Sequence, residues 1–499
     1  MRPGGRPAGS WIRTAGLLGL SALLVFSPTA LAATESEQAP NVILIVADDL
    51  GYGDIGAYGS EVVETPNIDA LAREGVRFTN GYVAAAVCSP SRAGLMTGRY
   101  PQRFGYHFNN NSGPGLPLSE RTLGERLTAN GYATGYIGKW HLGWRRPEQR
   151  PVARGFGSFF GMAAGSIFIE PDTPGVESWN RTPVPKRRER PIYRDNESVE
   201  ERDYLTDAFT REALSFIDVH HNERFFLYLA HYAPHVPLQA TRKYLDRYRH
   251  VEDPRQRILA AMVSAVDDSV GAIRAHLERY GLADNTLIWF LSDNGCALYT
   301  FGACTNRPLN GGKRYHYDGG IRVPFVMHWP GRIDSAVFDD PVSALDIVPT
   351  IMAAAGAPLA AGEVLDGVNL LAHLAEPELP PPHDSLFWRA GPNRAARIGS
   401  WKLWKVNRVD RARAESTPRG ELLEDWVAPE GSPLGQLTLL YDLSVDVGER
   451  RNLAAERPDV VLRLEAALNA WDRDMRSPSV DSIRGTGTFI DGEPVEIIF

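Results

Sequence analysis

The chain has 499 residues, of which 43% are hydrophobic and 23% charged, a composition typical of a folded protein large enough for two domains. Its 61 acidic side chains outnumber the 53 basic ones, so the formal net charge is −8. This acidic balance argues against a general nucleic-acid binder, and we expect no nucleic-acid partner.

Residues 1–33 predict a secretory signal peptide. Three arginines precede an apolar run from Ala15 to Phe26, and Ala30-Leu31-Ala32 supplies a small-x-small cleavage site. This run is short for a membrane anchor, and no other stretch is apolar enough to span a bilayer. We therefore expect an exported protein, periplasmic or secreted, with no membrane anchor and a formal charge of about −11 after cleavage.

The first strand after the signal is predicted from Asn41 to Ala47, because a continuous apolar run suits a strand buried on both faces of a mainly parallel sheet. It ends in Asp48-Asp49. Adjacent carboxylates repel each other unless they face water or share a cation, and ligands of open α/β sheets bind at this edge. Taken alone, such a pair is more often a solvated turn.

Cys88 begins the run Cys-Ser-Pro-Ser-Arg-Ala-Gly-Leu-Met-Thr-Gly-Arg, which predicts a loop that enters a helix. Pro90 suits the first helical turn, and the positive end of the helix dipole favours an anion beside residue 88. A thiol placed there is expected to ionise easily. A Cys-x-Pro taken alone is more often a buried structural cysteine.

Other predicted strands also lead into polar groups. Two of these groups, Lys139 and His141, are two residues apart, which on an extended segment puts both side chains on one face. The predicted strand at 132–137 leads to Lys139 and His141, and the strand at 225–230 leads to His235. The strand at 286–292 leads directly to Asp293 and Asn294. Lys313 lies in a glycine-rich loop before the predicted strand at 325–329. Helices are predicted at 65–75, 119–130, 204–220, 255–280, 342–352 and 458–474.

Two segments interrupt this alternating pattern. Residues 145–202 are rich in Pro, Gly and charge and predict a long irregular insertion over the active-site edge. Its basic run at 186–190 suggests a subsite for a polyanionic substrate, although a solvated loop is the commoner explanation. The Pro-rich run at 376–382 predicts a linker between a catalytic domain at 34–380 and a C-terminal domain at 381–499 with a small antiparallel sheet and one packed helix.

The chain has three cysteines, and an exported protein meets an oxidising compartment. Cys296 and Cys304 are near enough in sequence to close a small disulfide loop, which leaves Cys88 as the odd thiol. The alternative is that all three cysteines are reduced and structural.

Taken together and in this order, the motifs resemble those of the type I formylglycine-dependent sulfatases of the alkaline-phosphatase-like superfamily. The run from Cys88 through Arg92 is similar to their signature, and the C-terminal Leu440-Tyr441-Asp442-Leu443 also matches. The resemblance implies an α/β fold with a mainly parallel sheet flanked by helices, followed by a smaller C-terminal α+β domain with an antiparallel sheet. It also implies a sulfuric ester hydrolase whose substrate is a sulfated carbohydrate.

The resemblance implies a bound divalent cation as well. All four matched ligands carry hard oxygen donors, which suit Ca²⁺ or Mg²⁺ better than zinc, and the family implies Ca²⁺, with Mg²⁺ or Mn²⁺ less favoured. Without the resemblance, a solvated cluster of acidic loops would explain these residues. The matched ligands are Asp48, Asp49, Asp293 and Asn294, joined by Cys88 after its oxidation.

The remaining roles follow from the same resemblance. A formylglycine-generating maturation enzyme converts Cys88 to an aldehyde, whose hydrate attacks sulfur and then releases sulfate by C–O cleavage. The other matched side chains are Arg92, which holds the formylglycine, Lys139 and Lys313, which bind sulfate, His141, the base, and His235, the acid helped by Lys313. The alternatives are a phosphonate or phosphate monoester hydrolase of the same superfamily, or a non-catalytic sulfoglycan-binding protein whose Cys88 is unmodified.

Overall fold

A ten-stranded mixed sheet forms the centre of the described part of the chain, in the order β13-β2-β12-β11-β1-β9-β4-β5-β7-β8. The computed structural model describes Met1 and residues 39–109, 113–376, 378–416, 434–479 and 485–498, so the predicted signal peptide lies outside the described residues. The strands of this sheet are β1 (Asn41–Ala47), β2 (Val76–Phe78), β4 (Ala133–Lys139), β5 (Ser158–Met162), β7 (Ile192–Arg194), β8 (Glu197–Val199), β9 (Phe225–Ala230), β11 (Thr286–Ser292), β12 (Phe325–His328) and β13 (Ala336–Phe338).

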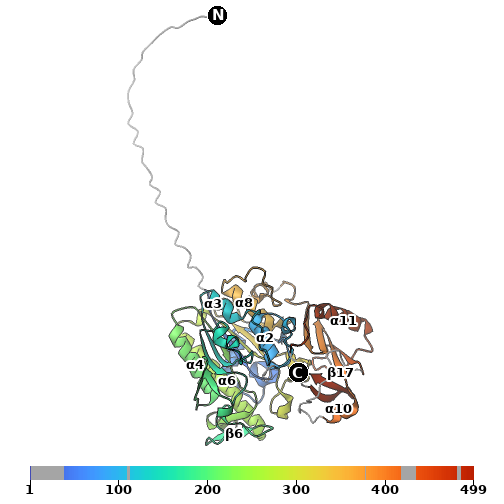
Figure 1. Ribbon diagram of the computed structural model, residues 1–499, viewed down its shortest axis with the longest axis horizontal. Coiled ribbons are helices and arrows are strands. Elements are labelled where there is room, and N and C mark those ends of the chain that lie inside the picture. The colour runs from blue at the N-terminus through green and yellow to red at the C-terminus, as the bar shows by residue number, and fades with distance from the viewer. Residues whose placement is uncertain (2–38, 110–112, 377, 417–433, 480–484, 499) are drawn as a thin grey trace, which may run out of the picture. The chain divides into compact units, whose positions relative to one another are not determined.

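Both faces of the sheet are buried, as the apolar run of β1 predicts. Val42, Leu44 and Val46 belong to one hydrophobic core, and the alternate residues Ile43 and Ile45 belong to another on the opposite face. Helices cover the two faces (Figure 1). The first core is covered by α2 (Cys88–Thr97), α3 (Leu123–Ala129), α8 (Ile347–Ala354) and α9 (Leu370–Ala375), and the second by α1 (Pro66–Glu74), α4 (Leu205–His220), α5 (Arg242–Leu245) and α6 (Pro254–Arg279).

A second, antiparallel sheet contains the C-terminal residues, coloured orange to red in Figure 1. Helix α11 (Pro458–Asp472) packs on it through Leu464 and Leu468, as the sequence predicts. Its strands are β15 (Ser385–Ala390), β16 (Asn393–Ile398), β17 (Trp401–Arg408), β18 (Gln436–Asp442), β19 (Gly485–Ile490) and β20 (Glu493–Ile498), and α10 (Arg411–Ser416) lies between β17 and β18. The division at 380/381 stays a prediction.

Short elements complete the described residues. They are the strand pairs β3 (Gly81–Tyr82) with β14 (Val342–Ser343) and β6 (Val176–Trp179) with β10 (Leu238–Thr241), and helix α7 (Asp318–Ile321). Within the described ranges, no helix combines the length and apolar character that crossing a membrane requires.

The structure corrects three predicted elements. The insertion at 145–202 is not wholly irregular, because β5, β7 and β8 extend the central sheet and β5 pairs in parallel with β4. Helix α3 begins at Leu123 instead of 119, since Thr122 and Glu125 form a capping box. The helix predicted from 342 begins at Ile347, because the two residues of β14 pair with β3.

A buried ion-pair network joins the C-terminal sheet to α7. Lys402 on β17 is fully buried, and its Nζ lies 2.6 Å from Asp318 Oδ1 and 2.8 Å from Glu449 Oε1. Burial raises the pKa of Glu449 to about 7. Burial would also raise the pKa of Asp318, but Lys402, followed by Arg322 and Arg397, holds it at about 2. One lysine is therefore shared by two buried carboxylates.

We expect Lys402→Met to lower the free energy of unfolding by about 3–5 kcal/mol, because buried Glu449 would lose its cation and buried Asp318 would lose the nearest of its cations. Lys405→Met is the matched control. Lys405 lies on the same strand and pairs with Glu465 where both are partly exposed, so the expected loss is below about 1 kcal/mol. Urea denaturation of both variants measures the difference. If both variants lose the same free energy of unfolding, the buried network does not depend on Lys402.

Candidate active site

Parallel strands bring the predicted site residues to one edge of the central sheet. β1 lies between β11 and β9, with Ala47 level with Ser292 and Val46 level with Ala230. The Asp293 N–H donates to the Ala47 carbonyl at 3.0 Å, which fixes the two strand ends. The residues that follow or end these strands are Asp48 and Asp49 after β1, Lys139 at the end of β4, His235 after β9, and Asp293 and Asn294 after β11.

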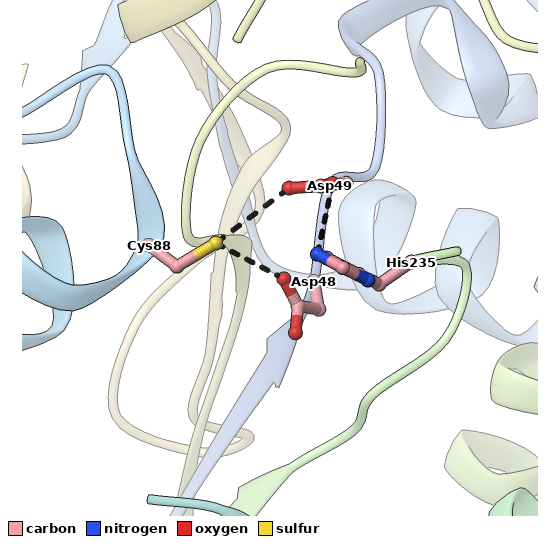
Figure 2. Close-up of side chains that lie close together, drawn as sticks. All are labelled: Asp48, Asp49, Cys88 and His235. Carbon is pink, nitrogen blue, oxygen red and sulfur yellow. Dashed lines mark hydrogen bonds and ion pairs between the residues drawn. The ribbon is translucent and has the colours of Figure 1, made fainter. Parts of the chain in front are cut away.

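Cys88 faces these strand ends from the first residue of α2 (Figure 2). Its Sγ lies 3.5 Å from Asp48 Oδ1 and 3.8 Å from Asp49 Oδ1, and the residue is 1% exposed. Burial, and after it the negative charge of Asp293, raises the pKa of the Cys88 thiol well above its ordinary value. The prediction that this thiol ionises easily is therefore wrong, because burial outweighs the neighbouring lysines.

Two buried cations hold Asp48 and Asp293. Arg92, one turn into α2, donates from Nε to Asp293 Oδ2 at 2.8 Å, and one of its terminal nitrogens lies 3.5 Å from Asp48 Oδ2. It also donates to the Lys139 carbonyl at 2.9 Å and so ties α2 to the end of β4. Lys139 Nζ donates to Asp48 Oδ2 at 2.6 Å. These cations offset the repulsion between the buried carboxylates.

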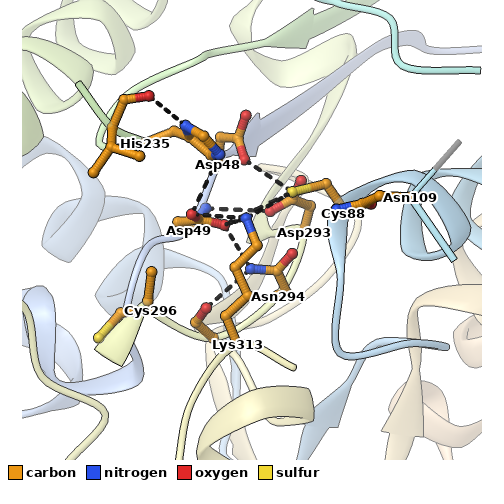
Figure 3. A network of polar contacts seen from close by, with 12 residues as sticks. Asp48, Asp49, Cys88, Asn109, His235, Asp293, Asn294, Cys296 and Lys313 are labelled. Atoms are coloured by element: carbon orange, nitrogen blue, oxygen red, sulfur yellow. Dashed lines mark hydrogen bonds and ion pairs between the residues drawn. The ribbon is translucent and has the colours of Figure 1, made fainter. Parts of the chain in front are cut away.

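Lys313 joins the third carboxylate to the cysteine (Figure 3). Its Nζ lies 2.6 and 2.8 Å from the two oxygens of Asp49 and 3.0 Å from Cys88 Sγ. Burial would raise the pKa of Asp49, but Lys313, followed by His235 and Lys139, holds it below its ordinary value. An ammonium group is thus fixed beside residue 88.

Both predicted histidines lie in the site. His235 Nε2 is 3.6 Å from Asp49 Oδ2, and its Nδ1 donates to the Val236 carbonyl at 2.6 Å. Burial lowers the pKa of His235 to about 3. His141 follows β4 with a positive φ of 60°, and burial, then Lys139, lowers its pKa well below the ordinary value. Both imidazoles are therefore neutral near pH 7.

The predicted ligands lie near one another, but not as one complete set. Asp48, Asp49, Cys88 and His235 offer two carboxylate oxygens, a sulfur and a nitrogen that all lie within 4.8 Å of one another. Asp293 is not part of this group, although its Oδ1 accepts a hydrogen bond from the Asp49 N–H at 3.2 Å. Asn294 is buried, and its Nδ2 donates to Asp49 Oδ1 at 2.7 Å, whereas its Oδ1 has no hydrogen-bond partner among the described residues. A buried amide oxygen without a partner, beside carboxylates, fits a hard divalent cation.

Sequence reasoning missed two tyrosines that border the site. Tyr232 stacks on His235 with ring centroids 4.9 Å apart, and Lys139 Nζ lies 5.6 Å from the Tyr232 ring centroid. Tyr299 donates from its hydroxyl to Asp49 Oδ2 at 3.4 Å. Tyr232 lies between β9 and His235 in the sequence, and this position could have indicated that it borders the site. Nothing in the sequence around Tyr299 indicates that its hydroxyl reaches Asp49.

A disulfide between Cys296 and Cys304 closes the loop that carries Tyr299, with the two Cα atoms 6.1 Å apart. The predicted pairing is confirmed, and Cys88 is a free, buried thiol.

Comparisons with known proteins agree with this geometry. The Sulfatase family profile matches residues 40–357. N-acetylgalactosamine-6-sulfatase of Mus musculus is 33% identical over 455 residues, which cover 86% of this chain and 84% of the relative. Arylsulfatase A of Bos taurus is 33% identical over 487 residues, which cover 91% and 93%. The solved structure of Ps i-CgsB in complex with k-i-k-neocarrahexaose has a TM-score of 0.76 and 34% identity, covering 89% of this chain and 94% of that one.

The profile match covers well over half of the chain, and every predicted site residue from Asp48 to Lys313 lies within it. The arylsulfatase and the two glycan-related proteins extend the similarity into the C-terminal sheet. The chain therefore belongs to the sulfatase family, sulfuric ester hydrolases with the alkaline-phosphatase-like fold.

Proposed function

We propose that the protein removes sulfate from a sulfated carbohydrate, with Cys88 converted to formylglycine and Ca²⁺ as its cation. The observation that carries this proposal is the position of Cys88 Sγ, 3.5 Å from Asp48 Oδ1 and 3.0 Å from Lys313 Nζ. The relatives support the carbohydrate, since one is an N-acetylgalactosamine-6-sulfatase and another is a structure in complex with k-i-k-neocarrahexaose.

The cation would be held by Asp48, Asp49, Asp293 and Asn294, with residue 88 as a further oxygen ligand after oxidation. Ligands from three separate segments suit the flexible coordination of Ca²⁺ better than the strict octahedron of Mg²⁺, and Mn²⁺ is also less favoured. When bound, the cation supplies positive charge to the sulfate oxygens and to the ionised nucleophile. Formylglycine supplies a nucleophile with two hydroxyls on one carbon.

The other side chains of the site position the sulfate and move protons. Lys139 and Lys313 bind the sulfate oxygens, because the Lys313 ammonium lies beside residue 88 and the Lys139 ammonium is bound to Asp48, which itself contacts Cys88. Arg92 orients residue 88 and keeps Asp293 in place. His141 accepts a proton as its neutral imidazole, and His235, assisted by Lys313, donates one to the leaving alcohol. An anionic sulfate beside His235 favours the protonated imidazole that this donation needs.

Maturation and export belong to the same proposal. Cys88 is 1% exposed in the folded chain, so a formylglycine-generating enzyme must reach it before α2 packs. The Cys296–Cys304 disulfide suits an oxidising compartment, in agreement with a periplasmic or secreted location.

The reaction itself is tested with para-nitrophenyl sulfate and para-nitrophenyl phosphate. We expect kcat/KM for the sulfate to exceed that for the phosphate, measured with the matured enzyme under the same conditions. A preference for the phosphate would favour a phosphate or phosphonate monoester hydrolase and overturn the proposal.

We expect Cys88→Ala to lower kcat for the aryl sulfate by at least about a thousandfold, because the nucleophile is lost. Mass spectrometry of the wild-type peptide that contains residue 88 should show an aldehyde there, with an oxygen in place of the sulfur and two hydrogens fewer than cysteine. Thr97→Val, at the other end of α2, is the control that should keep activity. An unmodified thiol in an active wild-type preparation would rule out formylglycine, and an unmodified thiol in an inactive one would favour a sulfoglycan-binding protein.

We expect Asn294→Leu to weaken Ca²⁺ binding by more than about tenfold, since even outer ligand partners contribute this much. The readout is the melting temperature with and without a chelator, because bound Ca²⁺ stabilises the folded chain. Asn285→Leu, at the opposite end of β11, should respond to the chelator like the wild type. If the chelator lowers the melting temperature of Asn294→Leu as much as that of the wild type, Asn294 is not a ligand.

A further inference from the structure

A cavity of 680 Å³ lies against the catalytic site. Lys313 lines it, and the same side chain places its Nζ 3.0 Å from Cys88 Sγ, so the cavity borders the site. Its volume lies in the range of pockets that hold small organic ligands. A molecule that presents a sulfate to residue 88 therefore has room in this cavity for a further part of its structure.

Aromatic side chains line the cavity from two distant segments of the chain. The disulfide-closed loop supplies Tyr299 and Phe301, and the hairpin of β19 and β20 supplies Phe489. Phe301 is 49% exposed and Phe489 is 39% exposed, although both are large apolar side chains. Trp179 packs edge-on against Phe301, with ring centroids 6.1 Å apart. Exposed aromatic rings around a cavity offer flat apolar faces of the kind that contact the C–H faces of a sugar.

The cavity also has charged side chains in its lining. Arg314 follows Lys313 directly, and its guanidinium carbon lies 4.9 Å from the ring centroid of Tyr299. Burial lowers the pKa of Arg314, and the positive charge of Arg181 lowers it further, so a third cation is nearby. Among the described residues that line the cavity, Asp491 alone carries a carboxylate, and its charge acts on Tyr317. Lys313 and Arg314, which are adjacent in the chain, thus bring positive charge to a cavity that borders the catalytic site.

We propose that this cavity is a second subsite that binds the sugar unit next to the cleaved sulfate ester, through Phe301 and Phe489, and a second anionic substituent of the substrate, through Arg314. The inference rests on the proposed function and narrows its substrate class. The enzyme selects oligosaccharides with two or more sulfate or carboxylate groups over singly sulfated ones, because a guanidinium in this setting forms charge-assisted hydrogen bonds with a planar or tetrahedral anion.

The test compares kcat/KM for pairs of chondroitin and carrageenan disaccharides that have the same backbone and carry either one or two sulfates. The wild-type matured enzyme should prefer the doubly sulfated member of at least one pair. Arg314→Met should lower that preference by about tenfold, mainly through KM, as expected for loss of hydrogen bonds to a charged group. Arg314→Lys keeps the charge and should retain part of the preference. Arg307→Met, exposed in the same segment, is the matched control and should keep the wild-type preference.

Phe489→Ala supplies an independent measurement on the hairpin side of the cavity. It should raise KM several-fold for both disaccharides of a pair, because the sugar loses the aromatic ring on which it stacks. The preference for the doubly sulfated disaccharide should stay unchanged. If the enzyme hydrolyses para-nitrophenyl sulfate but Arg314→Met keeps the wild-type preference, or no preference exists in any pair, the second subsite is overturned and the proposed function stands. Failure to hydrolyse every sulfate ester would overturn the proposed function itself.

Discussion

The structure depends on a balance between three buried carboxylates and three buried cations at the edge of the central sheet. An isolated buried charge costs several kcal/mol, so neither set would be stable there without the other. The six partners come from distant parts of the chain, and each carboxylate has at least one cation within 2.8 Å. Parallel pairing of β1 with β11 and β9 makes this possible, because the backbone ladder fixes where each strand ends to within one residue.

The balance extends from the sheet edge into the C-terminal domain. Lys313 is bound to Asp49 at one end of a short segment, and Asp318, five residues later, is bound to Lys402 at the other. Arg314 lies between these two anchors, and its backbone N–H donates to the Ala86 carbonyl at 2.8 Å, just before the cysteine. The C-terminal sheet therefore has a structural role in the site, since it holds the loop that carries Lys313 and part of the cavity lining.

Local patterns in the sequence were sufficient where a residue's place follows from its neighbours. The apolar run before Asp48 indicated a strand buried on both faces, and the Cys-x-Pro-Ser-Arg run placed Cys88 and Arg92 one helical turn apart. Local patterns are insufficient where contacts between distant segments decide whether a residue joins a strand or reaches the site. Ser158–Met162 lacks alternation and becomes a strand because β4 offers it a parallel edge, and Tyr299 reaches Asp49 because a disulfide shapes its loop. The helix dipole alone predicts the wrong direction for the pKa of the Cys88 thiol for a related reason, since the residues around Cys88 do not show the tertiary packing that buries it.

The burial of Cys88 affects the chemistry of residue 88. A thiol in this position is surrounded by carboxylates and shielded from water, and its pKa is raised, so it stays protonated and is a poor nucleophile. The same burial would strengthen the interaction of Lys139 and Lys313 with the sulfate that we propose they bind. A site built in this way favours a nucleophile whose reactivity does not depend on thiolate formation. The hydrated aldehyde proposed for residue 88 would meet that requirement, and a divalent cation held by the neighbouring carboxylates would supply positive charge beside its hydroxyls.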